Sequence, residues 1–259
     1  MKIAVCVKQI PDPEQPVAYD ESSHTLVRTA ELAFDDSDSY GVEMALRLAA
    51  EAGDADVTVV SMAPDGSTSG LRSALAMGAE NAVLISDPAL AASDALATAR
   101  VLAAAISRIG AELVVAATES TDGYTGTVPV QIAENLGYPV LSYVRKVELA
   151  AGKLKAERQT AEGFDEVACS LPALISVTAG VVEVRYPTFK GIMSARSKPV
   201  ETLTLADLGV DASAVGRAGG RQEVVSIEDA PDRGPGEVLE NAADPSAEIV
   251  ERLKIWKVL

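Results

Sequence analysis

A segment rich in glycine and threonine, residues 122–129 (DGYTGTVP), contains the residue types that bind an anion through the backbone. Gly123 and Gly126 allow a ligand to approach the main chain closely, and the two threonine hydroxyls can donate hydrogen bonds. Pro129 suits the first turn of a helix, and the N-terminus of a helix favours negative charge. The segment is therefore a candidate phosphate site. The same residues also begin helices that bind no ligand, so both interpretations remain open.

A second polar group that could contact a ligand is the acidic segment 35–38 (DDSD), directly before a predicted helix. Its carboxylates could accept hydrogen bonds from ribose hydroxyls, or they could only complement the positive end of the helix dipole. A calcium site of the EF-hand type would also need a glycine and a distal glutamate at fixed spacing, which this segment lacks. We therefore expect no metal site and leave the other two interpretations open.

The composition argues against several common catalytic sites. The 259 residues include one histidine, His24, in a polar stretch, so a HExxH zinc site is impossible and a catalytic triad lacks an evident orienting partner. The sequence contains no GxxxxGK[ST] motif and no GxGxxG motif after a strand, so the P-loop and classical dinucleotide fingerprints are absent. We expect no enzyme activity from this chain alone.

Charge and cysteine usage limit the partners and the compartment. A formal net charge of -16 works against nucleic-acid binding, because contacts to phosphates need a basic surface. Cys6 and Cys169 both lie in apolar alternating segments, where a free thiol behaves as a small hydrophobic group, so we expect no disulfide. No run approaches the roughly 20 apolar residues of a membrane helix, and residues 1–8 resemble a strand rather than a signal peptide. We therefore expect a cytoplasmic protein.

The elements that would position segments 35–38 and 122–129 alternate between strand and helix. Apolar runs and capping residues predict strands and helices in turn at 2–8, 39–52, 56–62, 67–77, 81–86, 93–109 and 112–117. This alternation predicts an α/β fold, a parallel sheet with helices on both faces. Ligands of such sheets bind beyond the carboxyl ends of the strands. The candidate phosphate segment follows the fourth predicted strand, so it lies where a ligand is expected.

The second half of the chain has a different pattern. Alternating segments 142–149, 153–160 and 166–177 predict extra antiparallel strands that extend or cap the sheet. The acidic tail is rich in glycine and proline over residues 216–244, which predicts an extended arm, and a last helix is predicted at about 245–256. We therefore divide the chain into an α/β domain, residues 1–214, and a C-terminal arm with a final helix, residues 215–259. An extended arm of this kind suits wrapping around a partner chain, so we expect residues 215–259 to contact a partner subunit.

Residues 186–193 (YPTFKGIM) combine aromatic, basic and methionine side chains in a predicted loop. This composition is typical of an adaptable contact surface. Alternatively, Phe189 and Met193 could pack on the core of the protein itself. The residues alone do not decide between these two interpretations.

Several segments together resemble the beta subunits of electron transfer flavoproteins. They include residues 5–12 (VCVKQIPD), 74–79 (ALAMGA) and 119–123 (ESTDG). The resemblance continues through Arg158, Gly163, residues 172–175 (PALI), Arg185, Tyr186, residues 191–193 (GIM) and residues 207–210 (DLGV). It therefore spans nearly the whole chain in the same order.

This resemblance implies a fold similar to the adenine nucleotide alpha hydrolases and a heterodimer with an alpha subunit that holds the redox FAD. It also implies a structural AMP in the beta subunit, and electron transfer from acyl-CoA and other dehydrogenases, as in fatty acid oxidation, to a membrane quinone oxidoreductase. The elements that match the family's AMP contacts are Cys6, segment 35–38, Met62 and the stretch from Asp122 to about Ala133. The residues that the resemblance implies as ligand contacts are Cys6, Asp35, Asp36, Ser37, Asp38, Met62, Asp122, Gly123, Thr125, Gly126, Thr127, Val128 and Pro129.

The family's partner-recognition loop matches residues 185–198, with Phe189 where an apolar anchor meets the dehydrogenase. The resemblance thus implies partner contacts through Tyr186, Phe189, Lys190, Ile192, Met193 and Arg196. Lys190, Arg196 and Lys198 would form a local basic patch that helps docking.

The sequence departs from the family pattern at three places. Segment 35–38 replaces one that commonly begins with Asn-Pro, Ala161 stands where an acid is usual, and Asp165 stands where Glu or Gln is usual. Electron-bifurcating members hold a second FAD in place of AMP, and residues 121–126 are partly similar to theirs. The alternatives are therefore a bifurcating subunit, a free-standing adenine nucleotide-binding protein similar to universal stress proteins, or a hydrolase or ligase that forms an AMP intermediate.

Overall fold

The computed structural model describes residues 1–28, 32–63, 66–232, 234, 236, 238–239 and 244–259. It divides the chain into two compact units, Met1–Val224 and Val225–Leu259, which are treated separately below. The contacts that the sequence predicts between residues 215–259 and a partner subunit stay a prediction.

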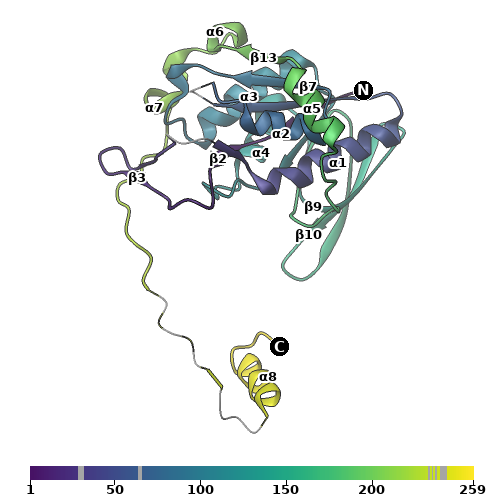
Figure 1. The fold of residues 1–259 in the computed structure, drawn as a ribbon. Coiled ribbons are helices and arrows are strands. Elements are labelled where there is room, and N and C mark those ends of the chain that lie inside the picture. Colours follow the sequence, from purple (N-terminus) through teal and green to yellow (C-terminus); the bar gives the residue numbers. More distant parts are fainter. Residues whose placement is uncertain (29–31, 64–65, 233, 235, 237, 240–243) are drawn as a thin grey trace. The chain divides into compact units, whose positions relative to one another are not determined.

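The first unit is built on a nine-stranded sheet in the order β11-β10-β9-β12-β8-β1-β6-β7-β13 (Figure 1). The neighbours from β9 to β13 in this order pair in parallel, whereas β10 pairs antiparallel with β9 on one side and with β11 on the other. The parallel strands are β1 (Lys2–Cys6), β6 (Asp56–Met62), β7 (Asn81–Ile85), β8 (Leu113–Ala117), β12 (Ala173–Val177) and β13 (Val200–Leu203). The extension consists of β9 (Val140–Ala150), β10 (Lys153–Gln159) and β11 (Phe164–Ser170).

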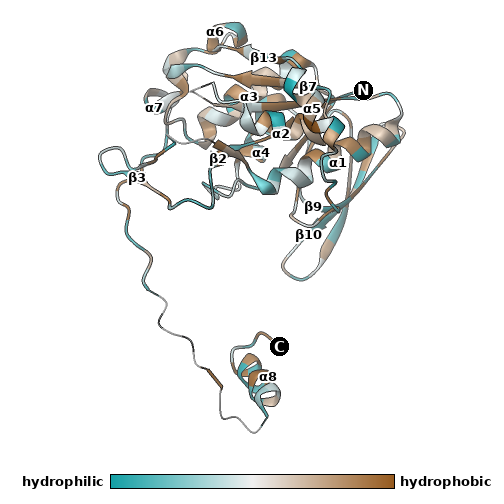
Figure 2. Ribbon diagram, in the orientation of Figure 1, coloured by the Kyte–Doolittle hydropathy of each residue, from teal (hydrophilic) through white to brown (hydrophobic). Residues whose placement is uncertain are grey.

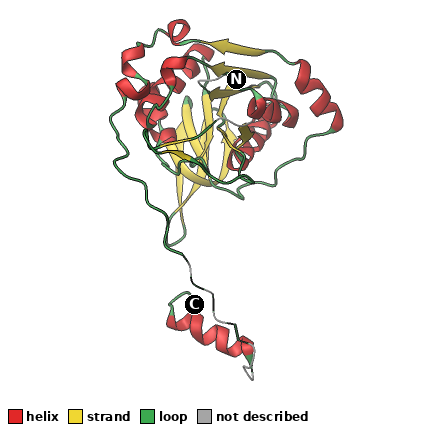
Figure 3. Cartoon of the chain, turned by 60° about the vertical axis from the view of Figure 1, so that its left-hand side comes forward, coloured by secondary structure: helices red, strands yellow, loops and turns green. Residues whose placement is uncertain are grey.

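Helices cover both faces of this sheet, as Figure 3 shows. They are α1 (Asp36–Ala52), α2 (Ser69–Met77), α3 (Ala95–Ile109), α4 (Val128–Leu136) and α5 (Phe189–Ser197). Helices α1, α2 and α5 pack in one apolar cluster with Ile3 and Val5 of β1, and α3 and α4 pack in another with Ala4. Because successive strand residues point to opposite faces, the two clusters lie on opposite sides of the sheet. The predicted α/β fold with extra antiparallel strands is confirmed.

The central strands form because their residues can be buried on both faces. β8 is buried along its whole length, and Figure 2 shows hydrophobic residues along the central strands. Capping residues set the helix ends: Asp94 caps the start of α3 by accepting from the Ala97 N–H, and Gly110 ends the helix with a φ of 70°. This burial and capping are the pattern that the sequence predicts for a parallel sheet between helices.

The prediction of one antiparallel strand over residues 166–177 is wrong. The structure divides this segment into β11 and β12, and β12 joins the parallel sheet between β8 and β9. Pro172 lies between the two strands, and a proline has no N–H to donate to a strand ladder. Five consecutive buried residues in β12 then fit the centre of a sheet better than an exposed hairpin.

The prediction that residues 186–193 form a loop is also wrong, because α5 begins at Phe189. The Thr188 hydroxyl accepts a hydrogen bond from the Gly191 N–H at 3.0 Å and caps the start of the helix. Gly191 lies so close to α2 that a Cβ atom there would be 2.5 Å from the Ala76 carbonyl oxygen. The close packing of α5 on α2 therefore depends on a glycine at this position.

Short elements complete the first unit. They are β2 (Gln9–Pro11), β3 (Tyr19–Asp20), β4 (Thr25–Leu26), β5 (Leu32–Phe34), α6 (Leu205–Leu208), α7 (Gly216–Gly219) and the 3-10 turns η1 (Pro88–Leu90) and η2 (Ala212–Ala214). β3 and β4 form a small hairpin, and β2 pairs with β5.

The second unit contains α8 (Pro245–Ile255), which confirms the predicted final helix. The Asp244 side chain accepts from the Ala247 N–H and caps its start, and Arg252 pairs with Glu248 one turn away at 2.8 Å. Among the described residues of 225–239 no helix or strand is present. No helix in the described ranges has both the length and the apolar character to span a bilayer.

Candidate functional site

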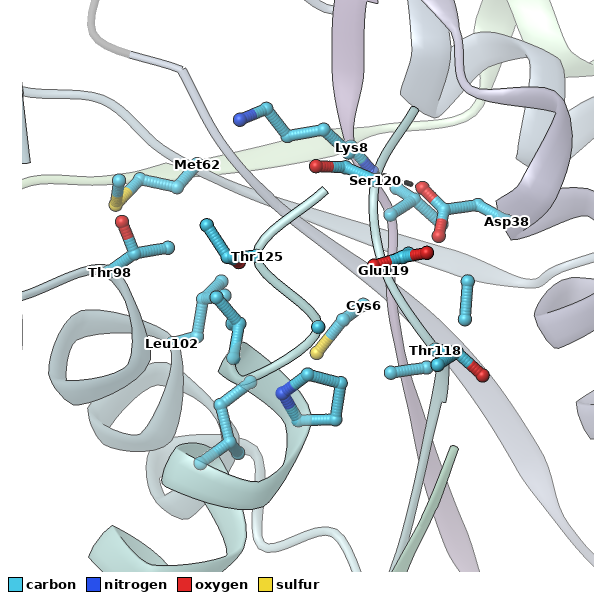
Figure 4. A pocket seen from close by; sticks show the side chains of 17 residues that line it. Cys6, Lys8, Asp38, Met62, Thr98, Leu102, Thr118, Glu119, Ser120 and Thr125 are labelled. Carbon is cyan, nitrogen blue, oxygen red and sulfur yellow. Dashed lines mark hydrogen bonds between the residues drawn. The ribbon is translucent and has the colours of Figure 1, made fainter. Parts of the chain in front are cut away.

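A cavity of about 110 Å³ lies beyond the carboxyl ends of β1, β6 and β8 (Figure 4). The sequence predicts a ligand site at this edge of the sheet. In Figure 4, Met62, Thr98 and Leu102 lie on one side of the cavity and Asp38 lies on the other. Helix α4 starts at the cavity, since Val128, Pro129 and Ile132 line it.

Some of the residues predicted to bind a cofactor come together in this cavity, and others lie outside its lining. Those that line it are Cys6, Asp38, Met62, Thr125, Gly126, Val128 and Pro129. The remaining candidates, outside the lining, are Asp35, Asp36, Ser37, Asp122, Gly123 and Thr127. Ile132, in the stretch that the resemblance matches, also lines the cavity, as do Thr118, Glu119 and Ser120 just before the candidate phosphate segment. The lining residues that sequence reasoning missed are Val7, Lys8, Thr98, Leu102, Ala116 and Ala117.

Asp35 joins the start of α1 to the segment after β8. Its fully buried carboxylate accepts hydrogen bonds from the Ser37 N–H at 3.0 Å and from the Thr121 N–H at 2.7 Å. The Ser37 hydroxyl donates to the same carboxylate at 2.8 Å. Asp36, the next residue, is exposed in the first turn of α1. Asp35 therefore holds the wall of the cavity in place through contacts within the protein.

Asp38 is a buried acid at the edge of the cavity. Its Oδ2 atom accepts a hydrogen bond from the backbone N–H of Lys8 at 2.5 Å. Burial raises the pKa of Asp38 well above its usual range, and the nearby Asp35 and Asp122 carboxylates add to this rise. The neutral form can donate a hydrogen bond to a ligand, whereas the ionised form can only accept.

Cys6 contributes a thiol at the end of β1. Burial, with a smaller contribution from the Asp38 charge, raises the pKa of the Cys6 thiol to about 12. The thiolate is the reactive form of cysteine, so Cys6 is an inert part of the cavity wall at neutral pH.

Asp122 is the centre of a charge cluster that holds the candidate phosphate segment. Arg28 Nη2 donates a hydrogen bond to Asp122 Oδ2, and Lys8 Nζ lies 3.7 Å from the same oxygen. Burial raises the pKa of Asp122, but the charges of Lys8 and Arg28 and the hydrogen bond from Arg28 outweigh it, so the pKa is lowered overall. The buried Oδ1 atom has no hydrogen-bond partner in the part of the chain that the structure describes. Asp122 thus stays ionised and joins residues far apart in the sequence.

The start of α4 has the features of an anion site. Thr127 is its N-cap residue, but the side chain makes no capping hydrogen bond, so the first-turn N–H groups have no side-chain acceptor there. Gly126 adopts a φ of 62°, which favours glycine, and a Cβ atom there would lie 3.3 Å from Glu119 Oε2. A helix N-terminus of this kind, open to a cavity, favours a phosphate group.

The side chains predicted to bind a partner lie on the surface of the segment before and within α5. Tyr186 is 93% exposed and Phe189 is 81% exposed, and Ile192 and Met193 are also exposed. Lys190 and Arg196 lie on the same segment and are exposed. The alternative that Phe189 and Met193 pack in the core is therefore wrong. Lys198 differs from the prediction, because its Nζ atom donates to the Ala79 carbonyl just after α2 rather than extending a basic patch.

Comparisons with known proteins show the family of this chain. A family model described as the electron transfer flavoprotein domain matches residues 23–208. The chain is 39% identical to an electron transfer flavoprotein subunit beta of Mycobacterium tuberculosis (strain CDC 1551 / Oshkosh), with 99% of each chain covered. It is 34% identical to the subunit beta of Megasphaera elsdenii, covering 98% of this chain and 96% of that one. A caffeyl-CoA reductase-Etf complex subunit, CarD of Acetobacterium woodii, is 31% identical with 98% of each chain covered. This chain therefore belongs to the electron transfer flavoprotein beta subunit family.

Proposed function

We propose that this chain pairs with an alpha subunit, binds AMP as a structural ligand in the cavity and helps to hold the FAD of the alpha subunit. The heterodimer docks acyl-CoA and other dehydrogenases, so that electrons pass from them to a membrane quinone oxidoreductase. The flavin supplies the redox chemistry, and this chain supplies binding and orientation. We place the protein in the cytoplasm, as the sequence predicts.

The observation that carries the nucleotide proposal is the meeting of the cavity with the open start of α4. Apolar side chains of Met62, Leu102 and Ile132 provide a surface for a purine ring, and the first turn of α4 provides N–H groups for a phosphate. Among the described residues that line the cavity, Lys8 is the one cation, beside the acids Asp38 and Glu119. The choice of AMP over a second FAD rests on the family resemblance.

A cavity-filling variant tests the AMP proposal. Thr98 lines the cavity from α3, so Thr98→Phe should fill the space and remove AMP from the purified heterodimer. Thr98→Val has nearly the same volume as the wild type and serves as the matched control, which should retain AMP. AMP extracted from each variant is measured per heterodimer. Full AMP content in Thr98→Phe would contradict this location of the nucleotide.

The exposed aromatic and apolar side chains of the α5 segment support the docking proposal. Buried aromatic anchors dominate the energy of protein interfaces, and Phe189 is free to act as one. Phe189→Ala should slow electron transfer from a reduced acyl-CoA dehydrogenase while the heterodimer keeps its flavin. Phe164→Ala, which removes a 47% exposed aromatic side chain from β11, is the control. Loss of flavin from Phe189→Ala, or unchanged transfer, would contradict the docking role.

Other proposals remain distinguishable. A bifurcating subunit would hold a second FAD in place of AMP. A free-standing nucleotide-binding protein would be stable alone and would bind ATP without a partner, and ATP turnover by the pure chain would favour a hydrolase or ligase. Cofactor content and copurification therefore separate these cases.

A further inference from the structure

Glu43 of α1 is a buried carboxylate at the centre of an ion cluster outside the cavity. The residue is 3% exposed, although it lies in a helix on the outer layer of the fold. Arg185 Nε donates to Glu43 Oε2 at 2.6 Å, and Arg185 Nη2 donates to Oε1 at 3.1 Å, a bidentate arrangement. Arg47 Nε donates to Oε1 at 2.8 Å from the next turn of α1. Both oxygens of the carboxylate are therefore used within the protein.

The cluster holds the backbone that leads into α5. Arg47 Nη2 donates to the Glu183 carbonyl at 2.7 Å, and Arg185 is the residue directly before the exposed Tyr186. Burial raises the pKa of Glu43, but the hydrogen bonds from Arg185 and Arg47 outweigh it and lower the pKa overall. The carboxylate therefore remains charged, holds Arg185 against α1 and keeps Arg47 in reach of the Glu183 carbonyl.

The far end of α5 is held by α2. Arg72 Nη1 donates to the Ala195 carbonyl at 2.7 Å and also to the Lys198 carbonyl. Lys198 in turn donates from its Nζ atom to the Ala79 carbonyl. Helix α5 packs on α2, as Figure 1 shows. The docking segment, defined here as residues 185–198, is thus fixed at both ends, while its middle presents Phe189 to solvent.

We propose that Glu43 and Arg185 are positioning residues for partner docking, because their ion pair fixes the docking segment in the orientation that a dehydrogenase recognises. The inference rests on the proposed docking function. A segment that is already ordered loses less conformational entropy on binding, so preorganisation raises affinity without an added contact. Glu43, being buried, acts through Arg185 and does not touch the partner.

Steady-state electron transfer from a reduced acyl-CoA dehydrogenase to the intact heterodimer tests this inference. Glu43→Gln keeps the shape of the side chain but removes the charge, so we expect the KM for the dehydrogenase to rise about tenfold, which corresponds to about 1.4 kcal/mol. The kcat at saturating dehydrogenase and the FAD and AMP contents should match the wild type. Glu51→Gln makes the same change at an exposed position of α1 and should leave the KM unchanged.

Hydrogen exchange gives a second readout that does not depend on the activity assay. Amides of residues 184–198 should exchange faster in Glu43→Gln, whereas those of β1 should not change. If Glu43→Gln does not assemble into the heterodimer, Arg185→Lys is the second variant. It removes the bidentate guanidinium from a side chain that is 45% exposed, and it should also raise the KM for the dehydrogenase.

Comparison with Phe189→Ala separates the two proposals. If Phe189→Ala raises the KM but Glu43→Gln and Arg185→Lys do not, and exchange in the docking segment is unchanged, the positioning role is overturned. If Phe189→Ala leaves the KM unchanged, the docking function itself is overturned. If the double variant of Glu43→Gln and Phe189→Ala has the same KM for the dehydrogenase as Phe189→Ala alone, the positioning role is supported, because both changes then act on one contact.

Discussion

Replacing Asp35 by alanine should weaken both the start of α1 and the wall of the candidate nucleotide cavity. The variant loses the N-cap of α1, a loss of about 1 kcal/mol. It also removes the charged acceptor of the Thr121 N–H, now bonded at 2.7 Å, and a hydrogen bond to a charged group contributes about 1.5–3 kcal/mol. The expected loss of unfolding free energy is therefore about 2.5–4 kcal/mol.

Thermal unfolding of the purified heterodimer measures this effect. A change of this size corresponds to a fall in Tm of about 10 °C for a chain of this length. Asp36→Ala is the matched control, because Asp36 is the neighbouring acid but is exposed, and surface substitutions usually change stability by less than about 0.5 kcal/mol. Asp35→Asn keeps one acceptor oxygen and should give an intermediate Tm.

Hydrogen exchange locates the loss. The amides of Ser37 and Thr121 should lose protection in Asp35→Ala, since both donate to this carboxylate. The AMP content should fall as well, because residues 118–120, 125 and 126 on either side of Thr121 line the cavity. A Tm equal to that of Asp36→Ala, with unchanged exchange at Thr121, would refute the structural role assigned to Asp35.

Two further predictions concern packing and pH. Gly191→Ala places a Cβ atom 2.5 Å from the Ala76 carbonyl oxygen, so thermal unfolding should show a loss of about 1–3 kcal/mol in unfolding free energy. Gly123→Ala is the control, because the nearest atom to its Cβ would lie 3.6 Å away, and it should leave the unfolding free energy nearly unchanged. The folded-state pKa of Asp38 is raised, so its contribution to stability is present below the unfolded pKa of about 4 and is lost as pH rises toward the folded pKa. Asp38→Asn should therefore lose less stability than the wild type between acidic and neutral pH in Tm measurements, and an equal pH dependence would contradict this.

The parallel sheet and its helices could be predicted because local signals agree with the final structure. Asp94 and Gly110 mark the ends of α3, and the apolar run of β8 requires burial on both faces. The segment around Pro172 is harder to predict, since the partly alternating β11 is followed closely by the short apolar run of β12, and a short apolar run does not show which strand it pairs with. Only pairing with β8, far away in the sequence, decides its place.

The candidate site was predictable only in part. Gly126 and Pro129 gave a local signal, and family resemblance added Cys6 and Met62. Thr98 carried no signal, because its place in the cavity depends on how α3 packs beside the sheet. The pair of Arg28 and Asp122 joins residues 94 positions apart, which no local pattern reveals.

The most direct test of the proposed function is to copurify this chain with its candidate alpha subunit and to quantify the extracted cofactors. We expect a stable heterodimer with one FAD and one AMP. Two FAD and no AMP would contradict the AMP assignment and indicate bifurcation. A chain that stays alone and binds ATP would contradict the electron-carrier function proposed for it.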